Sequence, residues 1–371
     1  MGFKEIPLPF RVKRPILALG GQSKNTVCFT RDYIAYLSEV HGDLSEPNCF
    51  HCFQESVGYF LKKRPAVIAC DLHPEYQSSK YASYLAAKYP VLAVQHHHSH
   101  IASCMAENTL TDKKVIGVAF DGTGWGENNT LWGAEFLCPC GYKEFKRAAH
   151  LREVPLLGGE MAIREPFRAA FAWLYLTFGE NFLDVSFLRR INKDTLRILK
   201  NMYKSGFNAI PASSMGRLFD AVAALVLEKD KAGFEAELAV LLEKTALSYR
   251  QKERGYQFKI IKTPEGLLLD PLPLFRQITL DLKAGDSQAK IAWRFHAAIA
   301  DAVKKTCMLL RHDTGINEVV LSGGVFQNSL LFNFTEESLS ASGFKVLSHH
   351  CLQPADSSIS LGQAAIANFR S

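Results

Sequence analysis

The sequence predicts an α/β protein in which one order of strands and helices, βββαβα, occurs twice. Three observations support this. Short apolar segments alternate with segments of helical period, three short strands open each half, and glycine-rich turns follow apolar strands at corresponding places. The chain has 371 residues, 47% hydrophobic and 22% charged, which is a globular composition and exceeds the usual size of one domain. We therefore expect two lobes, each with its own core.

The first copy of this order is expected in residues 15–112, as an N-terminal lobe. Residues 1–14 are interpreted as an extended lead-in or linker, because they carry two prolines and lack the apolar core of a signal peptide. The expected elements are strands Ile16–Gly20, Asn25–Arg31 and Tyr33–Val40, a helix near Cys49–Lys63, strand Ala66–Asp71, helix Ser78–Lys88, strand Val91–Gln95 and helix His97–Asn108.

The second copy is expected in residues 113–371, as a longer C-terminal lobe. Helices inserted at about 160–300, before the fourth strand, account for its length. The expected elements are strands Val115–Phe120, Thr130–Leu137 and Lys146–Val154, helices including Ile163–Thr177 and Met215–Leu227, strand Glu318–Leu321, a helix from Gln327 to Ser340, strand Lys345–Ser348 and helix Ser358–Arg370. Two such halves facing each other define the actin-like ATPase fold, in which ligands bind in the cleft between the lobes.

Charge and cysteine content narrow the functional classes. The net charge is +6, and the basic residues form only short clusters, so a nucleic-acid groove is not expected. No apolar run reaches about 18 residues, so no membrane span is expected. The nine cysteines are scattered, and the CxxC pair Cys49 and Cys52 has no second half with zinc-ligand spacing. We expect reduced cysteines in a cytoplasmic protein.

The sharpest chemical signal is the run Gln95-His-His-His-Ser-His100. His96 and His100 are four residues apart at a helix start, which puts them on one face with about 5–6 Å between their Cβ atoms. Two imidazoles at this spacing can bind one metal ion. The alternative is an exposed polar helix start, but four histidines in five positions are difficult to explain by packing.

Two aspartates can complete a metal site. Asp121 ends a buried strand, where a carboxylate is costly without a cation or hydrogen-bond donors. Asp356 precedes the last helix, where it can instead serve as an N-cap. A set of two histidines and two aspartates suits iron, zinc or manganese and does not choose among them.

Three glycine-rich turns are candidates for phosphate binding: Gly20-Gly21, Gly122-Thr-Gly124 and Gly323-Gly324. The sequence contains no GxxxxGK[ST] or GxGxxG motif, so P-loop and Rossmann sites are not favoured. In Ser213–Asp220, Arg217 can pair with phosphate and Asp220 can accept from ribose hydroxyls. The alternative for that segment is a capped amphipathic helix with one surface ion pair.

As a set, eight segments resemble the C-terminal, actin-like (ASKHA) half of HypF, the carbamoyltransferase of hydrogenase maturation. They run in order through nearly the whole chain: Leu17–Thr26, Asp71–Tyr76, Gln95–His100, Ala119–Gly124, Ile163–Pro166, Ser213–Ala224, Leu321–Asn328 and Ser360–Ala364. The same fold serves the tRNA threonylcarbamoyltransferase TsaD and antibiotic O-carbamoyltransferases.

The resemblance implies a reaction and a site. In HypF, a YrdC-like domain makes carbamoyl-adenylate from carbamoyl phosphate and ATP. The half that this chain resembles passes the carbamoyl group to the C-terminal cysteine of HypE, the start of cyanide-ligand synthesis for [NiFe]-hydrogenase. The metal, one divalent iron or zinc ion, would be held by His96, His100, Asp121 and Asp356, and Mg²⁺ can accompany the nucleotide. The implied adenylate pocket consists of Gly122, Thr123, Gly158, Gly159, Gly216, Asp220, Gly323, Gly324 and Asn328.

The sequence departs from the family pattern at a few close-approach positions. Ala236, Ser357 and Ser358 stand where the family usually has glycine, and added side chains there can crowd a nucleotide. The acylphosphatase, zinc and YrdC-like parts of HypF are not in this sequence, so we expect an excised or naturally separate domain. Two alternatives remain: a tRNA threonylcarbamoyltransferase-like enzyme, and a non-catalytic scaffold that binds nucleotide or metal.

Overall fold

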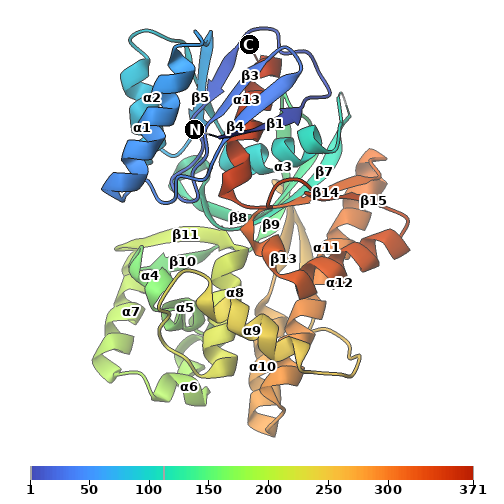
Figure 1. Ribbon diagram of the computed structural model, residues 1–371. Coiled ribbons are helices and arrows are strands. Elements are labelled where there is room, and N and C mark those ends of the chain that lie inside the picture. Colours follow the sequence, from blue (N-terminus) through green and yellow to red (C-terminus); the bar gives the residue numbers. More distant parts are fainter. Residues whose placement is uncertain (1, 112, 371) are drawn as a thin grey trace.

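The computed structural model describes residues 2–111 and 113–370 and has two lobes, each built on a sheet. In Figure 1 the first lobe lies at the top and the second lobe extends below it. The first sheet has the order β1-β4-β3-β2-β5-β6. Its strands are β1 (Phe3–Pro7), β2 (Ile16–Ala18), β3 (Cys28–Arg31), β4 (Ile34–Ser38), β5 (Val67–Asp71) and β6 (Val91–Val94).

The second sheet follows the path β12-β13-β9-β8-β7-β14-β15. Beside this path, β11 pairs with β10 and with β8. The strands are β7 (Val115–Trp125), β8 (Leu131–Cys140), β9 (Phe145–Leu151), β10 (Val154–Leu157), β11 (Ala209–Ser214), β12 (Lys259–Thr263), β13 (Gly266–Asp270), β14 (Glu318–Ser322) and β15 (Lys345–Leu347).

The two sheets share a five-strand core with the same connectivity. In the first, β4-β3-β2 are antiparallel and β2-β5-β6 are parallel. In the second, β9-β8-β7 are antiparallel and β7-β14-β15 are parallel. This repeat confirms the predicted α/β fold of two actin-like halves.

Helices complete each half and fill the expected insertion. In the first half they are α1 (Pro47–Leu61), α2 (Gln77–Leu85) and α3 (His96–Glu107), and in the second half α12 (Ser329–Ala341) and α13 (Ile359–Arg370). Between β10 and β14 the helices are α4 (Met161–Arg164), α5 (Phe167–Phe178), α6 (Ser186–Arg189), α7 (Lys193–Ser205), α8 (Met215–Leu227), α9 (Glu237–Leu247), α10 (Leu272–Ala284) and α11 (Gln288–Thr314).

Helices α3 and α13 pack against each other between the two sheets (Figure 1). Each one covers the sheet of the other half: α3 packs on β7 and β14, and α13 packs on β2 and β5. One apolar cluster joins both helices to both sheets, with Ile101 and Leu361 among its fully buried members. Because each helix packs on the sheet of the other half, the start of α3, with the histidine run, lies at the junction of the lobes.

The structure differs from the sequence prediction in three places. The lead-in is no linker, because β1 pairs with β4 and Leu8 and Phe10 are buried in the core. The helix expected at Ile163–Thr177 is two helices, α4 and α5, with Pro166 at the N-cap of α5. Strands β11, β12 and β13 were not expected, since they are short and lie in the stretch interpreted as helical insertions, and β10 follows the strand that was expected to end at Val154.

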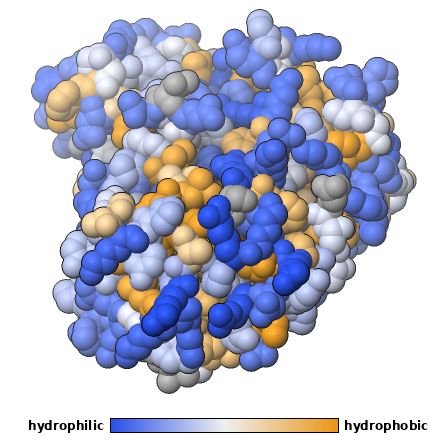
Figure 2. Space-filling model, turned by 90° about the horizontal axis from the view of Figure 1, so that it is seen from above, coloured by the Kyte–Doolittle hydropathy of each residue, from blue (hydrophilic) through white to orange (hydrophobic). Residues whose placement is uncertain are grey.

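Figure 2 shows a face dominated by hydrophilic residues, with hydrophobic residues in small groups. In the described part of the chain, the helices are all too short or too polar to cross a membrane. The nine cysteines are all free thiols, and Cys49 and Cys52 both lie in α1.

Candidate metal centre and nucleotide pocket

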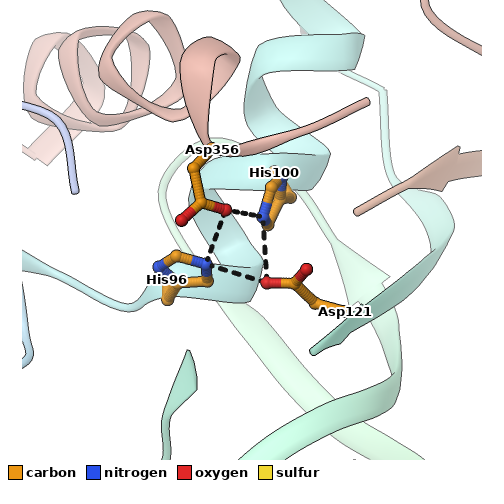
Figure 3. A group of neighbouring side chains, drawn as sticks. All are labelled: His96, His100, Asp121 and Asp356. Carbon is orange, nitrogen blue, oxygen red and sulfur yellow. Dashed lines mark hydrogen bonds and ion pairs between the residues drawn. The ribbon is translucent and has the colours of Figure 1, made fainter. Parts of the chain in front are cut away.

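Four side chains from three separate segments converge at the junction of the lobes (Figure 3). His96 and His100 come from the first two turns of α3, Asp121 from β7, and Asp356 from the loop before α13. His96 Nε2 lies 3.2 Å from Asp121 Oδ2 and 3.6 Å from Asp356 Oδ1. His100 Nε2 lies 3.6 Å and 3.5 Å from the same two oxygens.

This spacing fits one tetrahedral metal ion. Metal–nitrogen and metal–oxygen bonds of about 2.0–2.2 Å in tetrahedral geometry hold the ligand atoms about 3.4 Å apart. The four nitrogen–oxygen separations lie between 3.2 and 3.6 Å. Neither ring nitrogen of His100 has a hydrogen-bond partner among the described residues, although the side chain is fully buried. A buried imidazole without a partner is costly unless a ligand such as a metal ion satisfies it.

Local structure explains how each ligand reaches the site. The Gln95 side chain caps α3 by accepting from the amide of His98, so the helix begins at His96. The pairing of β7 with β8 is irregular between Phe120 and Gly124, which lifts the segment with Asp121 out of the ladder. The amide of Gly324 donates to Asp121 Oδ1 at 3.2 Å, and this contact leaves Oδ2 facing the histidines.

A carboxylate behind the site orients His96. Asp71, the last residue of β5, accepts from His96 Nδ1 at 2.8 Å, and both side chains are buried. The partner fixes the ring so that Nε2 faces the other ligands, an arrangement common among metal-binding histidines. Asp71 also accepts from the amide of His73.

The electrostatics of the cluster favour a positive charge at its centre. Burial alone lowers the pKa of His96, but the carboxylates of Asp71, Asp356 and Asp121 outweigh it and raise this pKa well above its ordinary value. In the same way burial raises the pKa of Asp121, while His100 and His96 more than reverse this and hold it well below its ordinary value. In the metal-free protein, protons on the imidazoles therefore supply the positive charge at the centre of the cluster, where a metal cation would also fit.

The neighbouring histidines have other environments. His97 is buried beside Gln95 and Trp132, and burial and the charge of His96 lower its pKa to about 3. His98 donates from Nε2 to the carbonyl of Gly141 at 2.6 Å, and burial lowers its pKa to about 4. Both are neutral packing residues that do not point at the cluster of four.

A cavity of about 480 Å³ adjoins the candidate metal centre, and Asp121 forms part of its wall. Five of the residues implied as an adenylate pocket line it: Gly122, Gly216, Asp220, Gly324 and Asn328. A methyl group on Gly216 would come within 2.8 Å of the Gly122 Cα, so the two backbones approach closely here. Gly323, with φ +100°, supports the cavity from behind, because a methyl group there would overlap the carbonyl of Phe120.

Arg217 is a further polar group in this cavity. Only 4% of it is exposed, and Nη1 lies 2.8 Å from Asp220 Oδ2, so the two expected ligand residues form a buried ion pair. Nε of Arg217 has no hydrogen-bond partner in the part of the chain that the structure describes. Burial and the charge of Glu235 raise the pKa of Asp220, against the opposing effect of Arg217. An anion in the cavity would give the free guanidinium N–H a partner.

Other residues assigned to the nucleotide lie elsewhere. Thr123 and Gly159 line a larger cavity of about 870 Å³, together with Gly124, and Gly158 precedes Gly159 in the turn after β10. Phe234 and Glu235 line both cavities. No role in the site was assigned to Glu235 or to Asp71 from the sequence, although Asp71 opens one of the segments that resemble the family.

The three positions that depart from the family pattern have different surroundings. Ala236 lines the smaller cavity in a left-handed conformation with φ +64°. The hydroxyl of Ser358 donates to the carbonyl of Ala355, and the carbonyl of Ser357 accepts from Thr26. The two serines thus shape the turn that carries Asp356, and Ala236 is the one that faces the cavity.

Comparison with known proteins agrees with this geometry. The family "HypF Kae1-like domain" matches residues 11–107, and "Carbamoyltransferase, Kae1-like Domain, second subdomain" matches residues 117–363. The chain is 35% identical over 381 residues to carbamoyltransferase HypF2 of Cupriavidus necator, covering 95% of this chain and 46% of that protein. It is 32% identical to a carbamoyltransferase HypF homolog of the same organism, covering 95% of this chain and 91% of that protein.

Two solved structures have the same fold. A crystal structure of full-length HypF in the phosphate- and nucleotide-bound form matches with a TM-score of 0.93 and 40% identity, over 99% of this chain and 57% of that one. The HypF of T. kodakarensis matches with a TM-score of 0.88 and 29% identity, over 98% of this chain and 48% of that one. The chain spans about half the length of most of the curated relatives it matches. From its sequence and its fold, the chain belongs to the HypF carbamoyltransferase family and corresponds to the Kae1-like part of those proteins.

Proposed function

We propose that this chain transfers a carbamoyl group from carbamoyl-adenylate to a thiol, with one divalent iron or zinc ion held by His96, His100, Asp121 and Asp356. The observation that carries the proposal is the position of Asp121. It belongs to the four-residue cluster and also lines the cavity that holds the glycines and Arg217. A metal ion there would lie against the reacting end of a bound adenylate.

The residues of the smaller cavity have distinct roles in this proposal. The backbones of Gly122, Gly216 and Gly324 allow phosphate oxygens to approach, and the free N–H of Arg217 supplies a charged donor. Asp220 and Asn328 offer polar groups to ribose and base. When bound, the metal polarises the carbamoyl carbonyl as a Lewis acid. Ala236 narrows the cavity without closing it, since about 480 Å³ remains.

The larger cavity is the proposed entrance for the acceptor. Thr123 and Gly124 line it, directly after Asp121 and Gly122 of the smaller cavity, and both cavities share Phe234 and Glu235, so a thiol that enters here is close to the carbamoyl carbon. The sulfur forms a bond to that carbon, and the carbon–oxygen bond to phosphate breaks. AMP leaves with the electron pair, and the thiol proton passes to solvent. By family resemblance the acceptor is the C-terminal cysteine of HypE, and the product serves cyanide-ligand synthesis for [NiFe]-hydrogenase.

Carbamoyl-adenylate must be supplied by another domain. By resemblance, a YrdC-like domain makes it from carbamoyl phosphate and ATP, and the proposed reaction takes place in the cytoplasm. We expect the chain alone to produce no AMP from carbamoyl phosphate and ATP, and to carbamoylate HypE once a YrdC-like domain is added. Production of AMP by the unaided chain would contradict this division of labour.

The first experiment measures metal content. Wild-type protein reconstituted with Fe²⁺ or Zn²⁺ should hold one equivalent, and the double variant His96→Ala/His100→Ala should hold none. His98→Gln is the matched control, because His98 is equally buried on the same helix and does not belong to the cluster. A folded wild-type protein that remains metal-free after reconstitution would favour a non-catalytic scaffold.

A further inference from the structure

The far end of α3 holds the loop that carries Asp356. Glu107, the last residue of α3, is 1% exposed in its side chain. Its Oε1 accepts from the backbone amides of His350, Cys351 and Leu352, at 2.7 Å and 3.1 Å for the first and last. Its Oε2 accepts from Nδ1 of His349 at 2.7 Å. One buried carboxylate therefore binds four donors from four consecutive residues.

Two further contacts anchor the same loop. The side chain of Asn108, the C-cap of α3, donates to the carbonyl of Ser348 at 2.8 Å. Beyond Asp356, the hydroxyl of Thr26 donates to the carbonyl of Ser357 at 2.9 Å. Asp356 thus lies between two points at which the loop is hydrogen-bonded to the rest of the protein. The end of α3 makes more of these hydrogen bonds than Thr26 does.

His349 extends this network to the glycine turn of the nucleotide cavity. Its Nε2 lies 3.0 Å from the hydroxyl of Ser322, the last residue of β14, and Gly323-Gly324 follows directly. The amide of Gly324 in turn holds Asp121. Burial outweighs the opposing effect of Glu107 and lowers the pKa of His349, which favours the neutral ring. A neutral ring with Nδ1–H directed at Glu107 accepts at Nε2 from Ser322.

A second metal site is the competing interpretation, since Glu107, His350 and Cys351 place an oxygen, a nitrogen and a sulfur within 4.8 Å of one another. The hydrogen bonds argue against it. Three backbone N–H groups already point at Oε1, the oxygen nearest His350, and their positive ends would repel a cation. The carboxylate of Glu107 is therefore already satisfied by hydrogen-bond donors and needs no metal cation.

We propose that Glu107 is a positioning residue that sets the place of Asp356 in the metal site. This inference rests on the proposed metal centre. The rigid helix α3 then positions three of the four ligands: His96 and His100 directly, at its start, and Asp356 through Glu107, at its end. Glu107 lies eleven positions after His96, about 16 Å along the helix, so the carboxylate acts at a distance from the ion and touches neither metal nor substrate.

The test compares Zn²⁺ affinity, by chelator competition, in wild-type protein, Glu107→Ala and Glu107→Gln. Loss of a residue that orients a ligand costs about 10-fold or more in metal affinity, so Glu107→Ala should raise the Kd for Zn²⁺ at least 10-fold. Glu107→Gln keeps one acceptor oxygen for the amides and should show a smaller loss. The control is Asp270→Asn, which removes a buried carboxylate from its pair with Arg152 in the second sheet. It should lower stability and leave the Kd unchanged.

A second readout separates positioning from general stability. Zn²⁺ should raise the Tm of wild type and of Asp270→Asn by similar amounts, and that of Glu107→Ala by clearly less. A Kd for Glu107→Ala within twofold of wild type overturns the inference and leaves the metal centre intact. A wild-type protein that binds no Zn²⁺ overturns the metal centre itself. A second equivalent of Zn²⁺ that is lost in Cys351→Ser would show that the cluster is a metal site and not a clamp.

Discussion

Nδ1 of His96 donates a hydrogen bond to Oδ2 of Asp71 at 2.8 Å, in a pair that is closed to solvent. A carboxylate can only accept, so this contact keeps the proton on Nδ1 and directs Nε2 at Asp121 and Asp356. The negative charge also makes the imidazole a stronger ligand. Asp71 therefore belongs to the proposed metal centre as a residue that orients His96 and is not itself one of the four candidate ligands.

This relationship predicts the effect of Asp71→Asn. The amide keeps the shape of the side chain but removes the charge and can present its NH₂ to the ring, so the orientation of His96 is lost. We expect the Kd for Zn²⁺ to rise by about 10- to 100-fold, measured by chelator competition. Glu75→Gln, a change of an exposed carboxylate that follows in the same loop, is the control and should leave the Kd as it is. An unchanged Kd in Asp71→Asn would remove Asp71 from the site.

Arg217→Lys tests the nucleotide cavity. Lysine keeps the positive charge beside Asp220 but lacks the planar fork and the free Nε–H, so a phosphate loses a directed donor. We expect the Kd for AMP to rise about 10-fold or more, with Zn²⁺ binding retained; titration calorimetry measures both. Arg152→Lys makes the same change in the ion pair with Asp270, outside both cavities. If both variants bind AMP as wild type does, Arg217 does not contact the nucleotide.

Ala236→Gly should stabilise the protein. Ala236 has φ +64°, where a side chain costs about 1–2 kcal/mol, and glycine has no such cost. The greater freedom of glycine in the unfolded chain offsets part of this gain, so we expect an increase of about 0.5–1 kcal/mol in the free energy of unfolding, measured with urea. Ala239→Gly, three residues on in α9, should lower it by about 1 kcal/mol. A loss of stability in Ala236→Gly would show that its methyl group packs favourably.

The fold and the four candidate ligands were predictable because their signals are local. The period of the apolar residues marks the strands and helices, and the four-residue spacing of His96 and His100 puts both on one face of α3. Asp121 follows an apolar run that predicts a strand, although β7 continues to Trp125, and Asp356 precedes a helix, so their place in the sequence suggests a role. The resemblance to a known family joined these separate signals into one site.

The remaining features depend on contacts that no local pattern encodes. Glu107 and His349 are 242 residues apart, and the end of a helix gives no sign that its carboxylate holds a distant loop. Thr123 follows Gly122 directly but lines the larger cavity with Gly124, in the segment where the pairing of β7 with β8 is irregular. The hairpin β12–β13 forms because β13 pairs with β9, a tertiary contact that outweighs the weak propensity of its own short segment.

Buried neutral histidines should make the metal-free protein sensitive to acid. Burial lowers the pKa of His97 to about 3, and those of His98 and His296 to about 4. As the pH falls, these histidines are protonated near pH 6.5 in the unfolded chain and only at lower pH in the folded protein. Their contribution to stability is therefore complete above about pH 6.5 and is lost as the pH falls toward the folded pKa.

His96 and His100 do not offset this loss. Their folded pKa values are raised, so their contribution in the metal-free protein is complete below about pH 6.5 and declines only as the pH rises through the folded values. His98→Gln tests only the loss of stability at acid pH, since a glutamine amide can still donate to the carbonyl of Gly141 and does not titrate. Between about pH 6 and about pH 5, with a chelator present, wild type should lose about 1 kcal/mol more unfolding free energy than His98→Gln, as measured by urea denaturation. Equal losses in the two proteins would mean that His98 is protonated in the folded state.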